Sequence, residues 1–230
     1  MNIPPAAEPA TPPVVLDSVF DMVMNGGPLM VPIALCSVVA LAYTVERSVR
    51  LRPGELGTKR LGRDILDAVE RDGPQAGLKV CKERKKPLAR ILGAGLGRFG
   101  SPMMEVEKAV EDAGEREVRR LSANLRPLVV VGMIAPLLGL LGTVWGMIEA
   151  FSSIALQDGL GKPELLASGI SQALITTAAG LAIAIPAQAI YYFFRGRIDR
   201  FVRSSEDLYL ELEQKLEHHR FPRIDAGSAS

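Results

Sequence analysis

Charged residues are missing from three long stretches of this 230-residue sequence, although they make up 23% of the whole. The stretches cover residues 22–45, 127–148 and 165–194, and each is predominantly apolar. A helix needs about 20 mostly apolar residues to cross the hydrocarbon core of a bilayer, and it satisfies its own backbone polar groups there. Buried helices of a soluble core seldom run this far without a charge. The sequence therefore predicts an all-α integral membrane protein with three transmembrane helices.

Cysteine and histidine are also scarce, at two residues each. Cys36 lies in the first apolar stretch and Cys81 in a charged segment, which is too few cysteines for a disulfide framework or a metal cluster. We expect two reduced thiols, no metal, no cofactor, no nucleic-acid partner and no enzymatic activity.

The N-terminus lacks Lys and Arg altogether as far as residue 21. A cleavable signal peptide would begin with basic residues, so the first apolar stretch is predicted to be a retained anchor. Proline-rich residues 1–13 are predicted to be disordered. Residues 14–27 alternate apolar and acidic positions as an interfacial helix does, and the first span then covers 28–45.

Basic residues predict the orientation. Residues 46–126 hold 19 Lys and Arg against 13 acids, whereas 149–164 hold one Lys against three acids. Because Lys and Arg flank the cytoplasmic ends of spans, we expect a periplasmic N-terminus, a cytoplasmic helical domain at 46–126 and a periplasmic loop at 149–164. The C-terminus is expected in the cytoplasm, with a helical extension at 195–220 and a disordered tail at 221–230.

Helical periodicity runs through the cytoplasmic segments. Apolar stripes cover residues 61–69, 88–99 and 106–125, and a further stripe continues the third span to residue 217. A run of Lys82, Arg84, Lys85 and Lys86 is either a solvated basic face or a contact with lipid or a partner.

Small residues recur every three or four positions in the second and third spans. Such faces let helix backbones approach closely in a membrane. They either pack the two spans within one subunit or line a lumen that holds another protein's helix, and the sequence leaves both alternatives open. The residues are Ala135, Gly139, Gly142 and Gly146 in the second span and Gly169, Ala173, Gly180 and Ala184 in the third.

Polar residues inside the spans are hydroxyls and amides only. Thr143, Gln172, Thr176 and Thr177 are our candidates for an ion pathway or a surface that faces a partner helix. The alternative is that the hydroxyls bond back to their own helix, or help to satisfy carbonyls freed at the predicted kinks, Pro136 and Pro186. No group here titrates near neutral pH, so any titrating group on an ion path must come from a partner.

Two motifs resemble a known family. Leu137-Leu138-Gly139-Leu140-Leu141-Gly142-Thr143-Val144-Trp145-Gly146-Met147 is similar to the second-span signature of ExbB and TolQ proteins. The run from Gly169 to Leu181, followed by Ala184-Ile185-Pro186-Ala187, is similar to their third-span signature. The related MotA subunit has four spans, which favours the three-span ExbB/TolQ branch.

The resemblance implies a ring-forming subunit of the bacterial inner membrane, assembled as a homopentamer around single-span partners of the ExbD/TolR type. Each partner carries a membrane Asp that takes up and releases the ion. Thr143 and Thr177 match family threonines of the ion path, and the motor would pull on a protein of the TonB/TolA type. Gln172 departs from the pattern, because the best-known members have Glu there, and the choice between H⁺ and Na⁺ stays open. The rival functions are a stand-alone channel or transporter, and a membrane scaffold for cytoplasmic proteins.

Overall fold

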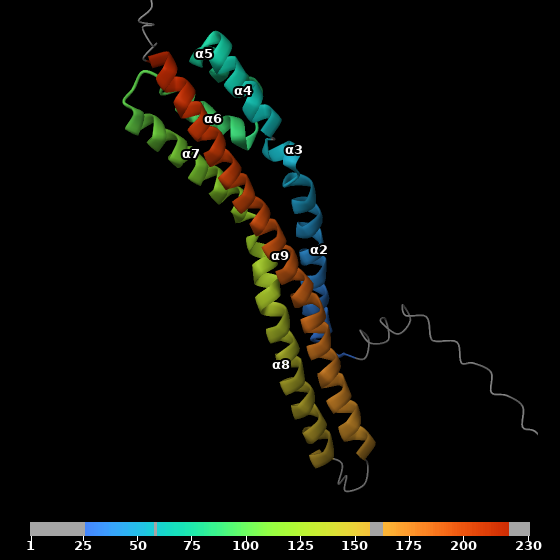
Figure 1. The fold of residues 1–230 in the computed structure, drawn as a ribbon. Coiled ribbons are helices and arrows are strands. Elements are labelled where there is room, and N and C mark those ends of the chain that lie inside the picture. The colour runs from blue at the N-terminus through green and yellow to red at the C-terminus, as the bar shows by residue number, and fades with distance from the viewer. Residues whose placement is uncertain (1–25, 58, 157–162, 221–230) are drawn as a thin grey trace, which may run out of the picture. The chain divides into compact units, whose positions relative to one another are not determined.

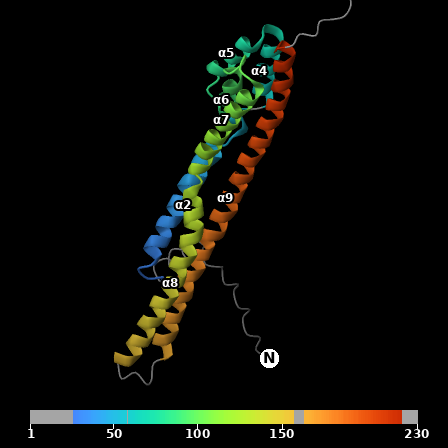
Figure 2. The same ribbon diagram turned by 90° about the vertical axis from the view of Figure 1, so that its left-hand side faces the viewer.

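The computed structural model describes residues 26–57, 59–156 and 163–220, and every regular element in these ranges is a helix (Figures 1 and 2). In chain order they are α2 (Met30–Arg50), α3 (Pro53–Leu56), α4 (Lys59–Asp72), α5 (Pro74–Glu83), α6 (Pro87–Leu96), α7 (Met103–Ala123), α8 (Arg126–Leu156) and α9 (Pro163–Arg220). The predicted all-helical fold is confirmed.

Within the described residues, three helical stretches are long and apolar enough to cross a membrane. They are α2, the stretch Met103–Ser153 that contains most of α8, and the stretch Leu166–His218 of α9. The three predicted spans are therefore confirmed, and the chain is a multi-pass membrane protein. The predicted segments 1–13 and 221–230 lie outside the described residues, as does all but the end of the predicted interfacial helix at 14–27.

Two compact units make up the chain, and the long helices contribute to both. The first unit comprises the described parts of Met1–Val38 and Val131–Pro186. The second comprises the described parts of Val39–Val130 and Ala187–Ser230.

In the first unit, α8 and α9 run side by side in opposite chain directions, as both views show (Figures 1 and 2). Their outward surfaces are apolar, with Leu137, Trp145 and Phe151 of α8 and Leu174 and Ile185 of α9 exposed. In a membrane protein such surfaces suit lipid or other membrane helices rather than water.

The core of the second unit is built from amphipathic helices. On α4 the predicted stripe of Leu61, Ile65, Leu66 and Val69 is buried. The helix ends at Asp72, because Gly73 adopts a φ of 82° that favours glycine. Pro74 then begins α5, since proline fits the first turn of a helix.

The structure adds α3 and α5 to the helices that periodicity revealed. The buried residues of α5 are Pro74, Gly77 and Cys81. None of them carries a long apolar side chain. Gly77 is required for close packing, because a Cβ there would collide with Val69 of α4. A stripe of large apolar residues is therefore absent, although the helix is closely packed.

The C-terminal half of α9 belongs to this same core. Its buried side chains lie on one stripe and join those of α4, α6 and α7, so the second unit is held together by residues far apart in the sequence. The α9 members are Phe194, Ile198, Phe201, Leu208, Leu212 and Leu216.

Ion pairs link the helices of this unit at its surface and within it. Arg90 of α6 forms a two-pronged pair with Glu117 of α7, with Nε–Oε1 at 2.6 Å and Nη2–Oε2 at 2.7 Å. Lys215 of α9 pairs with Glu70 of α4. The Lys215 ammonium lowers the pKa of the Glu70 carboxyl, chiefly by donating a hydrogen bond to it.

Burial makes Cys81 a probe of this core. The side chain is buried, and desolvation raises the pKa of its thiol to about 12. Because the thiolate is the reactive form, we expect Cys81 in a Cys36→Ser variant to react with iodoacetamide at pH 8 at least about a hundredfold more slowly than in the denatured chain. Equal rates in the folded and denatured states would mean that α5 is not packed as described.

Candidate functional site

The small-residue faces of α8 and α9 meet each other within one chain. We call this contact the seam. A Cβ added at Gly180 would lie 2.5 Å from the carbonyl oxygen of Ala135, and one added at Gly139 would lie 2.9 Å from Cα of Thr177. The seam comprises Ala135, Gly139, Gly142, Gly146 and Ala150 of α8 with Gly169, Ala173, Thr176 and Gly180 of α9.

The seam thus realises the first of the two alternatives that the sequence left open, packing of the two spans in one subunit. At Gly180 and Gly139 the neighbouring atoms are backbone, which cannot rotate away as a side chain can. Ala184 is also buried. Small residues allow this approach because van der Waals packing, rather than hydrophobic burial, holds membrane helices together.

The four polar candidates divide between the two edges of the seam. Gly139 lies against Thr177, whereas Gly142 lies against Thr176. Thr143 follows Gly139 by about one helical turn and therefore lies on the Thr177 edge. Gln172 precedes Thr176 by one turn and lies on the other edge. Thr143 and Thr177 thus lie on one edge of the seam, and Gln172 and Thr176 lie on the other.

The turn that precedes α2 covers part of the Gln172 edge. Gly27 has a φ of 73°, and a Cβ at this position would collide with the side-chain amide of Gln172. Thr176 is only 2% exposed and fills the space beside Gly142. This edge is therefore occupied by the chain itself. Among the described residues nothing comparable covers Thr143 and Thr177, which are both half-buried.

Hydrogen bonds decide what the two threonines can offer. Thr177 Oγ1 donates across the seam to the carbonyl oxygen of Gly139 at 2.8 Å. Thr143 Oγ1 donates to the carbonyl oxygen of Leu140 at 2.6 Å. A hydroxyl has one proton and two lone pairs, so each side chain has committed its proton and keeps only acceptor capacity. Such a surface suits a cation or the proton of a neutral carboxylic acid.

A shallow apolar groove on α8 begins at Thr143. Its lining residues are Thr143, Val144, Met147, Ile148, Phe151 and Ser152. Val144, Ile148 and Phe151 are exposed. The groove therefore places the Thr143 hydroxyl beside a surface that an apolar helix would cover.

The two prolines lie inside their helices, Pro136 in α8 and Pro186 in α9. Proline has no N–H, so the carbonyls one turn earlier, at Gly132 and Ala182, lack the usual helical donor. The hydroxyls of the threonines at the seam donate to other carbonyls. These threonines therefore do not serve to repair the proline sites.

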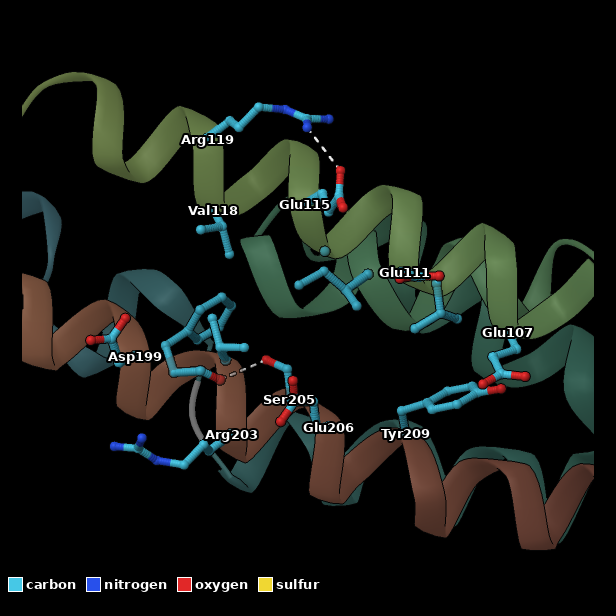
Figure 3. Close-up of a pocket in the computed structure, with 15 residues that line it drawn as sticks. Glu107, Glu111, Glu115, Val118, Arg119, Asp199, Arg203, Ser205, Glu206 and Tyr209 are labelled. Carbon is cyan, nitrogen blue, oxygen red and sulfur yellow. Dashed lines mark hydrogen bonds and ion pairs between the residues drawn. The ribbon is translucent and has the colours of Figure 1, made fainter.

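A separate hollow of about 870 Å³ lies in the second unit between α7 and α9 (Figure 3). Its lining includes apolar residues such as Val110 and Phe201, and Ser205 donates to the Phe201 carbonyl at 2.9 Å. Arg119 on its rim is paired with Glu115. Carboxylates outnumber guanidinium groups on the rim, so the hollow attracts cations rather than anions. The carboxylates are Glu107, Glu111, Glu115, Asp199 and Glu206.

Sequence comparison places these features in a known family. Residues 83–207, more than half of the chain, match the model of the MotA/TolQ/ExbB proton channel family. The chain belongs to this family. The matched residues include all of α8, the seam and both edge threonines.

Individual relatives extend the match beyond these residues. An ExbB-like biopolymer transport protein of Synechocystis is 34% identical over 75% of this chain and 68% of its own length. Biopolymer transport protein exbB1 of Vibrio cholerae is 31% identical over 76% of this chain and 78% of its own. Biopolymer transport protein ExbB of Neisseria meningitidis is 31% identical over 74% and 83%.

Two contacts between residues far apart in the chain, one at the seam and one in the second unit, have no counterpart in the sequence predictions. Nothing in the sequence pairs Gly27 with Gln172. Arg47 is 2% exposed, and its Nη1 donates to the carbonyl of Leu121 at 3.3 Å. Partners so far apart in the sequence leave no local signal.

Proposed function

We propose that this family member is the ring-forming subunit of an ion-driven motor of the ExbB/TolQ kind. It resides in the bacterial inner membrane with its N-terminus in the periplasm. In this proposal a homopentamer surrounds single-span partners of the ExbD/TolR type, which act in turn on a TonB/TolA-type protein. The relatives named as biopolymer transport proteins support this class of function.

The proposal rests on one observation, the two hydroxyls on the uncovered edge of the seam. Thr143 and Thr177 have given their protons to carbonyls of the same chain. No Asp, Glu, Lys, Arg or His occurs in residues 127–148 or 165–194. This chain can therefore accept a hydrogen bond from an acid or coordinate a cation, but it cannot store the proton itself.

A partner carboxyl group opposite this edge would be stabilised in its neutral form. The neutral acid donates its proton to a threonine lone pair, whereas the carboxylate would face lone pairs and repel them. Rotation or displacement of the partner past successive edges would alternate protonation and release. Each charge that crosses 100 mV provides about 2.3 kcal/mol, so several ions per cycle supply a mechanical stroke.

The proposed ion path uses Thr143 and Thr177. Gln172 and Thr176 are left out of the path, because Gly27 in the turn before α2 lies against Gln172 and Thr176 packs against Gly142 in the seam. Small residues that already pack α8 against α9 in the seam are not available to line the lumen of the ring. In the proposed ring, the Thr143 groove and the neighbouring apolar surface of α8 would receive the partner helix.

Thr177→Val tests the proposal. Valine keeps the shape of threonine but removes the lone pairs, so we expect output driven by the ion gradient to fall at least about tenfold while the complex still assembles. The readout is ion-dependent work by the reconstituted complex, with assembly checked by co-purification of the single-span partner.

Two controls make the result specific. Thr177→Ser keeps the hydroxyl and is expected to retain most of the output. Thr44→Val removes a span hydroxyl that bonds only to its own helix, at Ala40, and is expected to have little effect. Full output from Thr177→Val would remove this residue from the path. A selective proton or sodium current through the purified chain alone would instead favour the stand-alone channel.

A further inference from the structure

Cationic side chains from two separate segments of the sequence line a polar pocket of the second unit. Arg60 and Asp64 lie on α4, whereas Arg84 and Lys86 lie in the connection between α5 and α6. Leu61 contributes the remaining lining residue, and the pocket has a volume of about 350 Å³. Three cationic side chains therefore surround one hollow with a single carboxylate among them.

The two guanidinium groups of this pocket are not engaged by the protein. Among the described residues, neither the Arg60 nor the Arg84 side chain makes an ion pair or a hydrogen bond with another group. Both residues are exposed. The planar donor array of arginine matches the oxygens of a phosphate group and can bind them in pairs.

Hydrogen bonds hold the connection between α5 and α6, which contributes Arg84 and Lys86 to the pocket. Lys86 Nζ donates to the carbonyl of Gly54 in α3. Arg90 Nη1 donates to the carbonyl of Lys85 at 2.8 Å, and Arg90 is itself held by Glu117. The cationic connection is thus anchored on both sides, which lowers the cost of ordering it when an anion binds.

The first residue of the pocket follows the first membrane span closely in the sequence. Arg60 is ten residues beyond Arg50, the last residue of α2. Basic residues that follow a span closely experience the negative potential of an anionic leaflet. An anionic lipid headgroup is therefore the phosphate source that we test first, with a dissolved phosphate as its competitor.

We propose that Arg60, Arg84 and Lys86 form a binding site for a phosphate-bearing anion, with the phosphodiester of an anionic phospholipid as its ligand. The site is independent of the ion path, because none of its residues lies in α8 or in the spanning part of α9. It gives a specific role to part of the basic run at residues 82–86, which the sequence could not distinguish from a solvated face.

The test uses the full chain in phosphatidylcholine nanodiscs that contain increasing fractions of phosphatidylglycerol. Native mass spectrometry counts the phosphatidylglycerol molecules retained per chain. We expect the double variant Arg60→Gln/Arg84→Gln to weaken retention about tenfold. The matched control is Lys79→Gln/Lys82→Gln, which removes the same charge from exposed residues of α5 outside the pocket. This control is expected to change retention less than twofold.

Asp64 gives a second test with the opposite sign. Asp64→Asn removes the one carboxylate from the pocket and is expected to strengthen retention severalfold, since a like charge then no longer faces the phosphate. Asp67→Asn makes the same change on an exposed position of α4 outside the pocket and is expected to have a smaller effect. Protection of Cys81 from alkylation shows that each variant remains folded.

The outcomes separate the alternatives. Equal losses in the two double variants would indicate a diffuse basic surface and overturn the site. Release of phosphatidylglycerol by millimolar glycerol 1-phosphate, lost in Arg60→Gln/Arg84→Gln, would support the anion site and identify dissolved phosphates as competing ligands. Retention of neither phosphatidylglycerol nor glycerol 1-phosphate by the unmodified chain would also overturn it.

Discussion

Replacing Gly180 by alanine is expected to destabilise the packing of α8 on α9 by about 1–3 kcal/mol, the usual cost of forcing extra volume into a packed interior. The new methyl group would lie 2.5 Å from the carbonyl oxygen of Ala135 and 3.3 Å from Cα of Gly139. These are backbone atoms, so the helices must separate along the seam. The loss is measured as the shift in thermal unfolding of the purified complex.

Gly196→Ala is the matched control on the same helix. Nothing lies within 4 Å of a Cβ at Gly196, and alanine is the better helix former by about 1 kcal/mol. This variant is expected to be neutral or slightly stabilising. A Gly180→Ala protein as stable as the unmodified one would mean that the seam is looser than described.

Glu117→Gln is expected to have the second large effect, on the second unit. The Glu117 side chain is 9% exposed, and the pair with Arg90 is two-pronged. Loss of one partner from a fully buried pair costs about 3–5 kcal/mol. The Arg90 side chain is 39% exposed, so water screens part of the interaction, and about 1–3 kcal/mol is expected here. Chemical denaturation, followed through the alkylation of Cys81, measures the loss.

Glu115→Gln provides the comparison on the same helix. Glu115 pairs with Arg119 one turn away, and both side chains are more than half exposed. Exposed pairs of this kind contribute at most about 0.5 kcal/mol. Similar losses in the two variants would contradict a special role for the Arg90 pair. The hydrogen bond from Arg90 to Glu117 is also the main reason why the pKa of the Arg90 guanidinium is raised. Arg90 therefore stays charged at any physiological pH.

Local patterns predicted the helices well and their partners poorly. Long charge-free stretches identified the spans, because crossing a bilayer sets a minimum length. The break at Gly73 and Pro74 was predictable, since both residues act on the backbone directly. The short helix α5 was not predictable, because its buried residues Gly77 and Cys81 are small and allow close packing but do not form a stripe of large apolar side chains.

The candidate site shows the same division. The residue types and spacing of Thr143, Thr176 and Thr177 were evident in the sequence, but their separation onto two edges was not. That separation depends on how α9 is rotated against α8, which is set by contacts such as Gly139 with Thr177. The docking of Gly27 on Gln172 likewise joins positions 145 residues apart in the sequence.

The tightness of the seam has a consequence for electrical insulation. Thr176 fills the space beside Gly142 and backbone meets backbone at Gly180, so the two helices are in direct contact at these positions, with no room for water. An ion that entered this contact would lose its hydration shell without gaining other ligands. The free-energy cost of moving it between the helices would therefore be high. A helix pair packed in this way therefore offers no low-energy route for an ion at these contacts.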